Sequence, residues 1–231
     1  MINGNSFLAI IPARGGSKRL PRKNVLPLAG KPLITWTIEA ALASAYLDKI
    51  LVSSDDDEIL AIAEVAGIQA LARPAEFSQD TSSSFDVIKH ALGQVATYDF
   101  VVLLQPTSPL RSGCDIDSAI ELLARKQGDG VISVAPVEHS PLWVNTLPPD
   151  DSMVGFLSED VKALRSQELK EHYRLNGAIY ISKVDKLLGA GSFFLGANVY
   201  AYKMSQEASV DIDTKLDFRW AEFLVGARQG T

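Results

Sequence analysis

Cysteine is almost absent from the sequence, because Cys114 is the only one among 231 residues. A disulfide within the chain is therefore impossible, and a zinc site built on cysteine thiolates is not expected. Long apolar runs are also missing, since no segment approaches the roughly 20 residues that span a bilayer. The apolar run at residues 7–11 is too short for a signal peptide. We expect a soluble, cytoplasmic protein with no membrane partner.

Positive charge is scarce overall, and the formal net charge is -6. This balance argues against a general nucleic-acid partner. One basic segment stands out near the N-terminus, IIPARGGSKRLPRKN at residues 10–24. Its five cationic residues are Arg14, Lys18, Arg19, Arg22 and Lys23. Against an acidic background, this segment predicts a site for a local anion rather than for a polyanion.

The order of predicted elements indicates an α/β fold. Short apolar runs predict strands at 7–11, 49–55, 68–72, 99–105, 130–137, 173–182 and 197–204, and helical spacing predicts helices over 31–46, 56–67, 83–96, 115–127 and 213–228. Alternation of strands and helices predicts a mostly parallel sheet with helices on both faces. We expect the loops that follow the strands to meet at one edge of this sheet.

The alternation breaks at residues 138–172, which are rich in proline and acidic residues. We interpret this segment as an excursion from one domain that spans 1–231. Large apolar side chains within it, Leu142, Trp143, Phe156 and Leu157, need a partner surface if they are exposed. The excursion therefore predicts a homodimer.

The basic segment has the chemistry of a phosphate site. Gly15 and Gly16 permit backbone conformations that present successive amides to an anion. Arg14 and Lys23 can neutralise phosphate oxygens, the first as a bidentate fork and the second as a point charge. The segment matches neither a Walker A motif nor G-x-G-x-x-G, and a solvated basic loop is the alternative.

The same segment resembles the opening motif of the sugar-activating cytidylyltransferases, in particular the acylneuraminate group. Later segments resemble further motifs of that group in the same order: LQPTSPLR at 104–111, YRLNGAIYI at 173–181, SFF at 192–194 and VDIDTKLDF at 210–218. The opening also resembles enzymes for the shorter sugar Kdo, but PRKN followed by NGAIY favours nine-carbon acids. The resemblance implies transfer of CMP from CTP to a 2-keto sugar acid, with release of pyrophosphate.

The resemblance also implies which residues hold the nucleotide. It places Arg14, Ser17 and Lys23 on the triphosphate, Asn24 on the nucleotide, Arg73 on the cytosine base and Ser83 nearby, with Ser82 and Ser84 as alternatives to Ser83. An arginine can donate to the carbonyl and ring nitrogen of cytosine while rejecting the N–H of uracil. Taken alone, Arg73 could equally be a surface cation.

Two aspartates near the C-terminus are candidates for a metal site. On an extended segment, Asp211 and Asp213 lie on the same side, because side chains alternate. Two carboxylates, completed by phosphate oxygens and water, suit Mg²⁺. The alternative is that Asp213 caps the following helix. In the competing acidic run at 55–58, Asp56, Asp57 and Glu58 are expected to start a helix, whereas Asp55 ends a strand and could face the site. We expect Arg14, Lys23 and Asp211 to carry the catalysis.

The sugar side of the site is also implied by the resemblance. Gln105 and Tyr180 would border the sugar, and Phe193 with Phe194 would form an apolar wall, although core packing explains a phenylalanine pair equally well. The sugar carboxylate needs a cation, for which Arg165, reaching a neighbouring subunit, and Arg174 are the candidates. Ser166 stands where the family's arginine aligns, so a one-residue insertion is needed to match Arg165.

Other functions fit part of the pattern. The acid could be legionaminate or pseudaminate instead of N-acetylneuraminate. The chain could also be a nucleotidyltransferase for another sugar, or a CTP-binding protein without catalysis.

Overall fold

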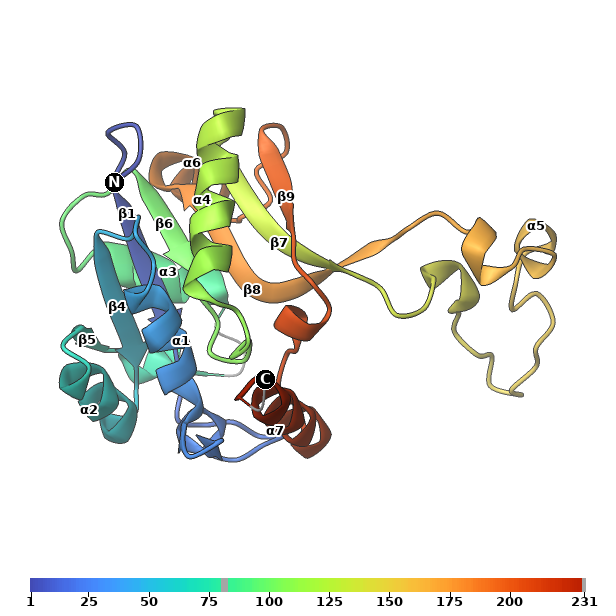
Figure 1. The fold of residues 1–231 in the computed structure, drawn as a ribbon, viewed down its shortest axis with the longest axis horizontal. Helices are drawn as coiled ribbons and strands as arrows, with labels where there is room; N and C mark the ends of the chain where they lie inside the picture. Colours follow the sequence, from blue (N-terminus) through green and yellow to red (C-terminus); the bar gives the residue numbers. More distant parts are fainter. Residues whose placement is uncertain (80–82, 230–231) are drawn as a thin grey trace.

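The computed structural model describes residues 1–79 and 83–229, and a seven-stranded sheet forms its centre (Figure 1). The strands are β1 (Phe7–Pro12), β4 (Lys49–Ser54), β5 (Gln69–Ala72), β6 (Phe100–Leu103), β7 (Gly130–Pro136), β8 (Tyr173–Lys183) and β9 (Val199–Lys203). Their order is β5-β4-β1-β6-β8-β7-β9. Only β8 runs against its neighbours β6 and β7, and the other pairs in this sheet are parallel. The mostly parallel sheet is therefore confirmed.

Helices cover both faces of the sheet, as the sequence predicts. One face packs against α1 (Leu33–Leu42), α2 (Asp57–Val65) and α4 (Gly113–Lys126), and the other against α3 (Ser84–Leu92) and α6 (Val184–Ala190). Strand β1 shows why, since Ala9 and Ile11 belong to the first core and Leu8 and Ile10 to the second. Strands buried on both faces are apolar throughout rather than alternating.

Two details differ from the sequence prediction. The first helix begins at Leu33 instead of residue 31, because Lys31–Pro32 pair with Pro27–Leu28 as a two-stranded ribbon of β3 and β2. Helix α6 was not predicted, and it is only seven residues long. The last helix, α7 (Lys215–Gln229), was predicted, and it packs on a third core cluster that includes Leu33. Among the described helices, none is long and apolar enough to cross a membrane.

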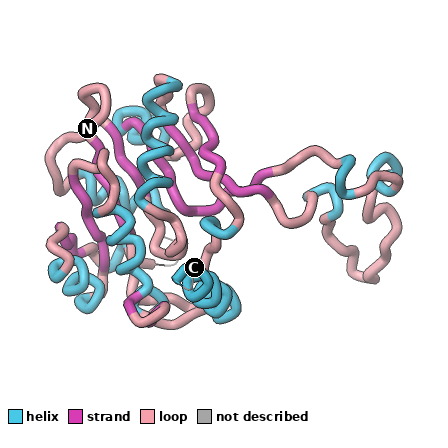
Figure 2. The backbone as a smooth tube through the Cα atoms, viewed as in Figure 1, coloured by secondary structure: helices cyan, strands magenta, loops and turns pink. Residues whose placement is uncertain are grey.

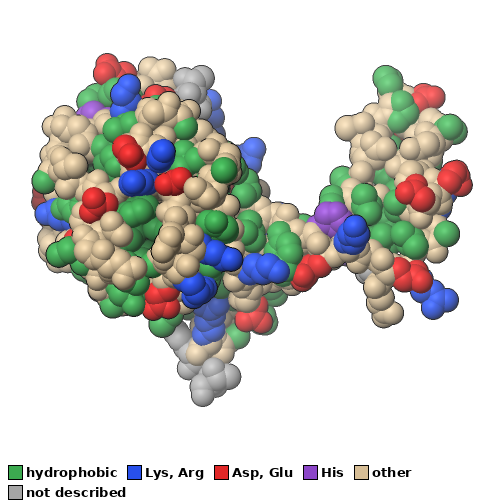
Figure 3. Space-filling model, turned by 90° about the horizontal axis from the view of Figure 1, so that it is seen from above, with side chains coloured by type: hydrophobic (Ala, Val, Ile, Leu, Met, Phe, Trp, Pro, Cys, Tyr) green, Lys and Arg blue, Asp and Glu red, His purple; other side chains and the backbone are tan. Residues whose placement is uncertain are grey.

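Residues 138–172, which we call the arm, project from the body between β7 and β8 (Figure 1). The arm is mostly loop around α5 (Glu159–Lys162), as Figure 2 shows. Figure 3 shows it as a separate lobe with apolar side chains on its surface. Of the four apolar residues expected to be exposed, Leu142 is exposed and the other three are half-buried. Val144, Leu147, Met153 and Val154 add further exposed apolar surface.

Candidate active site

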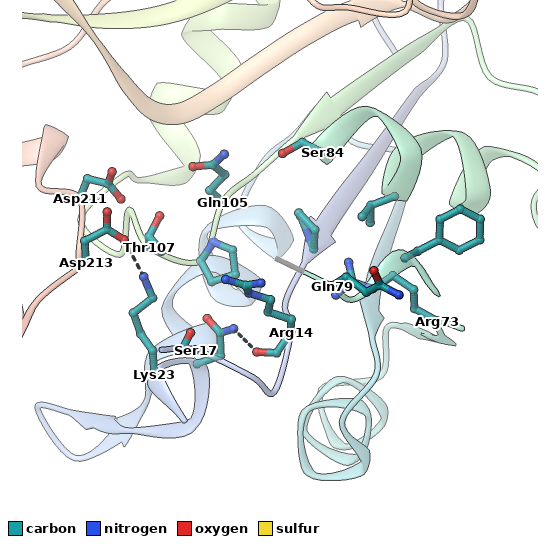
Figure 4. Close-up of a pocket in the computed structure, with 15 residues that line it drawn as sticks. Arg14, Ser17, Lys23, Arg73, Gln79, Ser84, Gln105, Thr107, Asp211 and Asp213 are labelled. Atoms are coloured by element: carbon teal, nitrogen blue, oxygen red, sulfur yellow. Dashed lines mark hydrogen bonds and ion pairs between the residues drawn. The ribbon is translucent and has the colours of Figure 1, made fainter. Parts of the chain in front are cut away.

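One cleft lies at the edge of the sheet where parallel strands end. Strands β5, β4, β1 and β6 are adjacent and parallel, so the loops that follow them meet at the same edge. The loops after β1, β5 and β6, the start of α3 and the segment between β9 and α7 enclose a cleft of about 390 Å³ (Figure 4). The lining residues are Pro12, Arg14, Ser17, Lys23, Asn24, Arg73, Phe77, Gln79, Ser84, Val87, Gln105, Pro106, Thr107, Asp211 and Asp213. Ligands of parallel α/β sheets bind at this position.

The cleft brings together many of the residues that the sequence singles out. Those that line it are Arg14, Ser17, Lys23, Asn24, Arg73, Gln105, Asp211 and Asp213. Those outside this lining are Gly15, Gly16, Ser83, Arg165, Arg174, Tyr180, Phe193 and Phe194. The ligand role of each residue stays a prediction, and the contacts below describe how the fold holds them.

The basic loop contacts one of the two aspartates, Asp213, across the cleft. The Lys23 ammonium lies 3.1 Å from Asp213 Oδ1 and also donates to the carbonyl oxygen of Ile212. Arg19 pairs with the other oxygen of Asp213, Oδ2, at 3.1 Å. Lys23 is buried in a short 3₁₀ turn, Lys23–Val25. Residues 190 positions apart therefore share one site, as Figure 4 shows.

The same turn fixes the shape of the basic loop. The Asn24 side chain donates to the carbonyl oxygen of Arg14 at 2.9 Å. Arg22, which has a left-handed backbone with φ 54°, pairs with Asp56 at 2.8 Å and also contacts Glu58. These contacts link the loop after β1 to the start of α2, and leave Arg14 and Lys23 along the cleft.

The two glycines of the loop differ. The Gly15 amide donates to Asp55 Oδ1 at 3.1 Å, so it is engaged within the protein. A Cβ on Gly15 would lie 2.5 Å from Asp56 Oδ2, whereas one on Gly16 would meet nothing within 4 Å. Neither glycine has a positive φ. Position 15 therefore requires glycine because the backbone packs closely against Asp56.

Asp211 and Asp213 flank a buried isoleucine, Ile212, whose amide donates to the carbonyl oxygen of Thr107 at 2.8 Å. This bond ties the aspartates to the loop after β6. Burial raises the pKa of the Asp211 carboxyl, while a hydrogen bond with Thr107 acts in the opposite direction and the charge of Asp213 adds to the rise. Asp211 is nevertheless open to solvent along the cleft, and two neighbouring carboxylates favour a bound cation.

The donor set fits a magnesium ion. Among residues 1–79 and 83–229, no three Asp, Glu, His or Cys side chains gather as a metal cluster. Asp211 and Asp213 would supply two carboxylates, and the rest of the shell would come from ligand oxygens and water. Mg²⁺ is usually bound in this way, through one or two carboxylates and substrate phosphates.

The far end of the cleft is built around Arg73. Its guanidinium donates through Nε to Ser78 Oγ at 3.1 Å, and Nη2 lies 3.7 Å from Asp55 Oδ1. Burial lowers the pKa of Arg73, because a desolvated cation is disfavoured, and the charge of Arg14 also lowers it. The side chain is 3% exposed, so Arg73 is a buried cation rather than a surface cation.

Of the three serines considered, Ser84 lines the cleft. Ser83 caps α3 instead, in a reciprocal capping box with Asp86. Ser82 lies outside the described residues. Sequence alone does not distinguish the three serines. In the structure, the direction of the side chains at the start of α3 distinguishes Ser83 from Ser84.

Gln105, which the resemblance places at the sugar, follows β6 into the cleft. Gly177, at φ 74°, leaves room for Gln105, because a Cβ there would lie 2.8 Å from Gln105 Oε1. Burial raises the pKa of the Tyr180 phenol, and the charge of Asp211 adds to the rise, so the two lie within electrostatic reach. Tyr180 packs on Phe193, with ring centroids 5.5 Å apart.

The remaining sugar candidates lie elsewhere. Phe193 is buried in the second core cluster, which is the packing alternative for this residue, while Phe194 is 61% exposed beside β9. Arg174 pairs with Glu138 at 3.4 Å at the base of the arm. Arg165 is exposed in the arm beyond α5.

Sequence reasoning missed part of the lining. Phe77, Gln79 and Val87 come from the stretch between β5 and α3 and from α3 itself, where no pattern distinguishes them. Thr107 stands within the LQPTSPLR segment, and its position after an apolar strand is the signal that could have found it.

Known proteins are similar to this chain in sequence and in fold. A family model described as Cytidylyltransferase matches residues 8–222. The chain is 41% identical over 213 residues to an N-acylneuraminate cytidylyltransferase of Streptococcus agalactiae, covering 91% of this chain and 51% of that protein. The chain thus spans about half the length of this relative. It is 36% identical to a CMP-N,N'-diacetyllegionaminic acid synthase of Legionella pneumophila, covering 96% of this chain and 97% of that one.

A solved structure shares the fold. It is a CMP:2-keto-3-deoxy-manno-octonic acid synthetase complexed with CTP, with a TM-score of 0.75 at 18% identity, covering 96% of this chain and 99% of that chain. With the family match over nearly the whole chain and a relative matched along its full length, this chain belongs to the cytidylyltransferase family.

Proposed function

We propose that the protein transfers CMP from CTP to a nine-carbon 2-keto sugar acid, N-acetylneuraminate or a relative, and releases pyrophosphate. The observation that carries this proposal is the contact of Lys23 with Asp213 in one cleft that Arg14 and Asp211 also line. Cations and carboxylates side by side are what a triphosphate with its metal needs. The names of the relatives from Streptococcus and Legionella supply the substrate class.

In the proposed reaction, the anomeric hydroxyl oxygen attacks the α-phosphorus, the hydroxyl proton is lost, and the bond to pyrophosphate breaks. Phosphoryl-type transfer depends mainly on positioning and on charge neutralisation. Arg14 and Lys23 neutralise the triphosphate, and Gln105 lies where the sugar side of the cleft begins. Asp211 and Asp213 would hold Mg²⁺, which neutralises charge on phosphate oxygens.

Arg73 would select cytosine over the other bases. Its buried guanidinium can donate to the acceptors of cytosine, whereas uracil presents an N–H at the same edge. Discrimination is strong where a site is built around buried polar groups, because the wrong ligand leaves them unpaired. We therefore expect CTP to be preferred over UTP.

The arm would form the interface of a homodimer. Its exposed apolar surface and its projection from the body support a partner copy that covers it. Arg165 would then approach the cleft of the other copy and meet the sugar carboxylate, while Arg174 is the candidate within the same chain. Since Arg174 is already paired with Glu138, Arg165 is the more available cation.

A second acid has specific support. The relative matched along its full length is a legionaminic acid synthase, so CMP-legionaminate synthesis is the alternative within the same chemistry. CMP-pseudaminate synthesis is tested alongside it.

The test is incubation with CTP, Mg²⁺ and each of the three acids, with detection of pyrophosphate and CMP-sugar. We expect product with at least one acid. Asp211→Ala should lower the rate by about 100-fold or more, because it removes a metal-holding carboxylate. Asp57→Ala, an exposed aspartate on α2, is the matched control and should leave the rate unchanged. Absence of product with every acid would refute the proposal, and a near-normal Asp211→Ala rate would refute the metal role.

A further inference from the structure

Asp55 lies between the loop after β1 and the loop after β5, both of which line the proposed site. It directly follows β4, which lies between β1 and β5 in the sheet. The loop after β1 carries the phosphate-binding cations, and Arg73 directly follows β5. A side chain at the end of the middle strand can reach both neighbours, because the parallel strands end at the same edge.

The contacts of Asp55 use that position. Its Oδ1 accepts from the Gly15 amide at 3.1 Å, and the same oxygen lies 3.7 Å from Nη2 of Arg73. Asp55 is not among the residues that line the cleft, so its role is argued through the residues that do line it. Any effect it has on a ligand must pass through the basic loop or through Arg73.

The charges explain why an acid is needed there. The Arg73 side chain is 3% exposed, and Arg14 is close enough for its charge to oppose that of Arg73. A buried cation next to another cation is destabilised unless a counter-charge is near. Asp55 supplies the ion pair that the described part of the chain shows for Arg73, and Ser78 fixes the Nε edge of the same group.

We propose that Asp55 is a positioning residue that holds Arg73 and the basic loop in one arrangement and thereby sets the preference for CTP. This inference rests on the proposed function, in which Arg73 contacts the base. Because Asp55 and Ser78 hold its guanidinium, Arg73 presents its remaining donors to the cytosine edge in a fixed orientation. Without the charge of Asp55, the guanidinium can reorient away from Arg14 and lose its selectivity.

The Asp55→Asn variant separates the contact of residue 55 with Arg73 from its contact with the Gly15 amide. In Asp55→Asn, the amide oxygen can still accept from Gly15, but the negative charge beside Arg73 is lost. Binding of CTP, UTP and pyrophosphate is measured by calorimetry with Mg²⁺, since pyrophosphate reports on the loop alone. Asp57→Asn, the same change on exposed α2, is the matched control.

We expect Asp55→Asn to weaken CTP binding by roughly tenfold and to lower the CTP-over-UTP ratio by a similar factor, as for loss of a charge-assisted contact. Pyrophosphate binding should change by less than about threefold, and Asp57→Asn should match the unmodified protein in all three. In the Arg73→Ala background, Asp55→Asn should not change the CTP-over-UTP ratio further. That lack of additivity separates positioning from general damage.

Asp55→Glu keeps the charge if the amide variant does not fold. Its carboxylate is one methylene longer, so we expect an intermediate CTP-over-UTP ratio. Unmodified selectivity in both variants, or additive effects of Asp55→Asn and Arg73→Ala on the ratio, would overturn the inference while leaving CTP binding intact. If the unmodified protein does not bind CTP in preference to UTP, the base assignment of the proposed function fails, and this inference fails with it.

Discussion

At the residue scale, the adjacent glycines of the basic loop offer a matched pair. Gly15→Ala places a methyl group against Asp56, which holds Arg22, and should therefore distort the loop. We expect KM for CTP to rise by roughly tenfold, as for loss of a charge-assisted contact. Gly16→Ala adds a methyl group in open space and should leave KM nearly unchanged. An equal loss in both variants would contradict close packing against Asp56 as the reason for glycine at position 15.

Which residues line the cleft could be predicted where chain order decides it. Arg14 and Gln105 each come shortly after an apolar strand, and parallel strands end at one edge. Contacts that depend on side-chain direction could not be predicted. The approach of Asp55 to Arg73 across neighbouring loops is one such contact, because no local pattern connects the two positions.

At the element scale, the start of α3 separates a structural serine from a lining serine. Ser83→Ala removes the capping box with Asp86 and should lower the free energy of unfolding by about 1 kcal/mol. Ser84→Ala removes a hydroxyl from the cleft lining and should affect CTP binding more than stability. Thermal unfolding and KM for CTP, measured on both variants, distinguish the two roles. Loss of CTP binding in Ser83→Ala at unchanged stability would contradict this assignment.

Strand and helix positions followed from periodicity, but the pairing of strands did not. The apolar run that forms β8 was predicted, whereas its insertion between β6 and β7 against their direction was not. Sheet order is set by long-range packing, to which a local pattern is blind. Helix α6 was missed because it spans only Val184–Ala190 and contains Gly189, so its helical period is too short to detect.

At the scale of the whole molecule, the arm makes a prediction about assembly. We expect a dimer in which each arm is covered by the partner copy. Sedimentation should therefore give the mass of two chains. Val154 in the arm is 93% exposed in the single chain, and Val65 on α2 is 92% exposed. Val154→Lys should weaken the dimer by roughly tenfold or more, because a charge would be buried at an interface. Val65→Lys, with the same change outside the arm, should not.

A monomer at all concentrations would contradict the role of the arm. Equal dimer affinity for Val154→Lys and the unmodified chain would place the interface elsewhere on the molecule.

The central claim is that the cations near residue 14 and the aspartates near residue 211 act on one triphosphate. A crystal structure with CTP and Mg²⁺ tests this most directly. The account predicts phosphate oxygens within hydrogen-bonding distance of Arg14 and Lys23, the metal on Asp211 and Asp213, and the cytosine edge on Arg73. A triphosphate bound away from this cleft, or a metal bound without either aspartate, would contradict it.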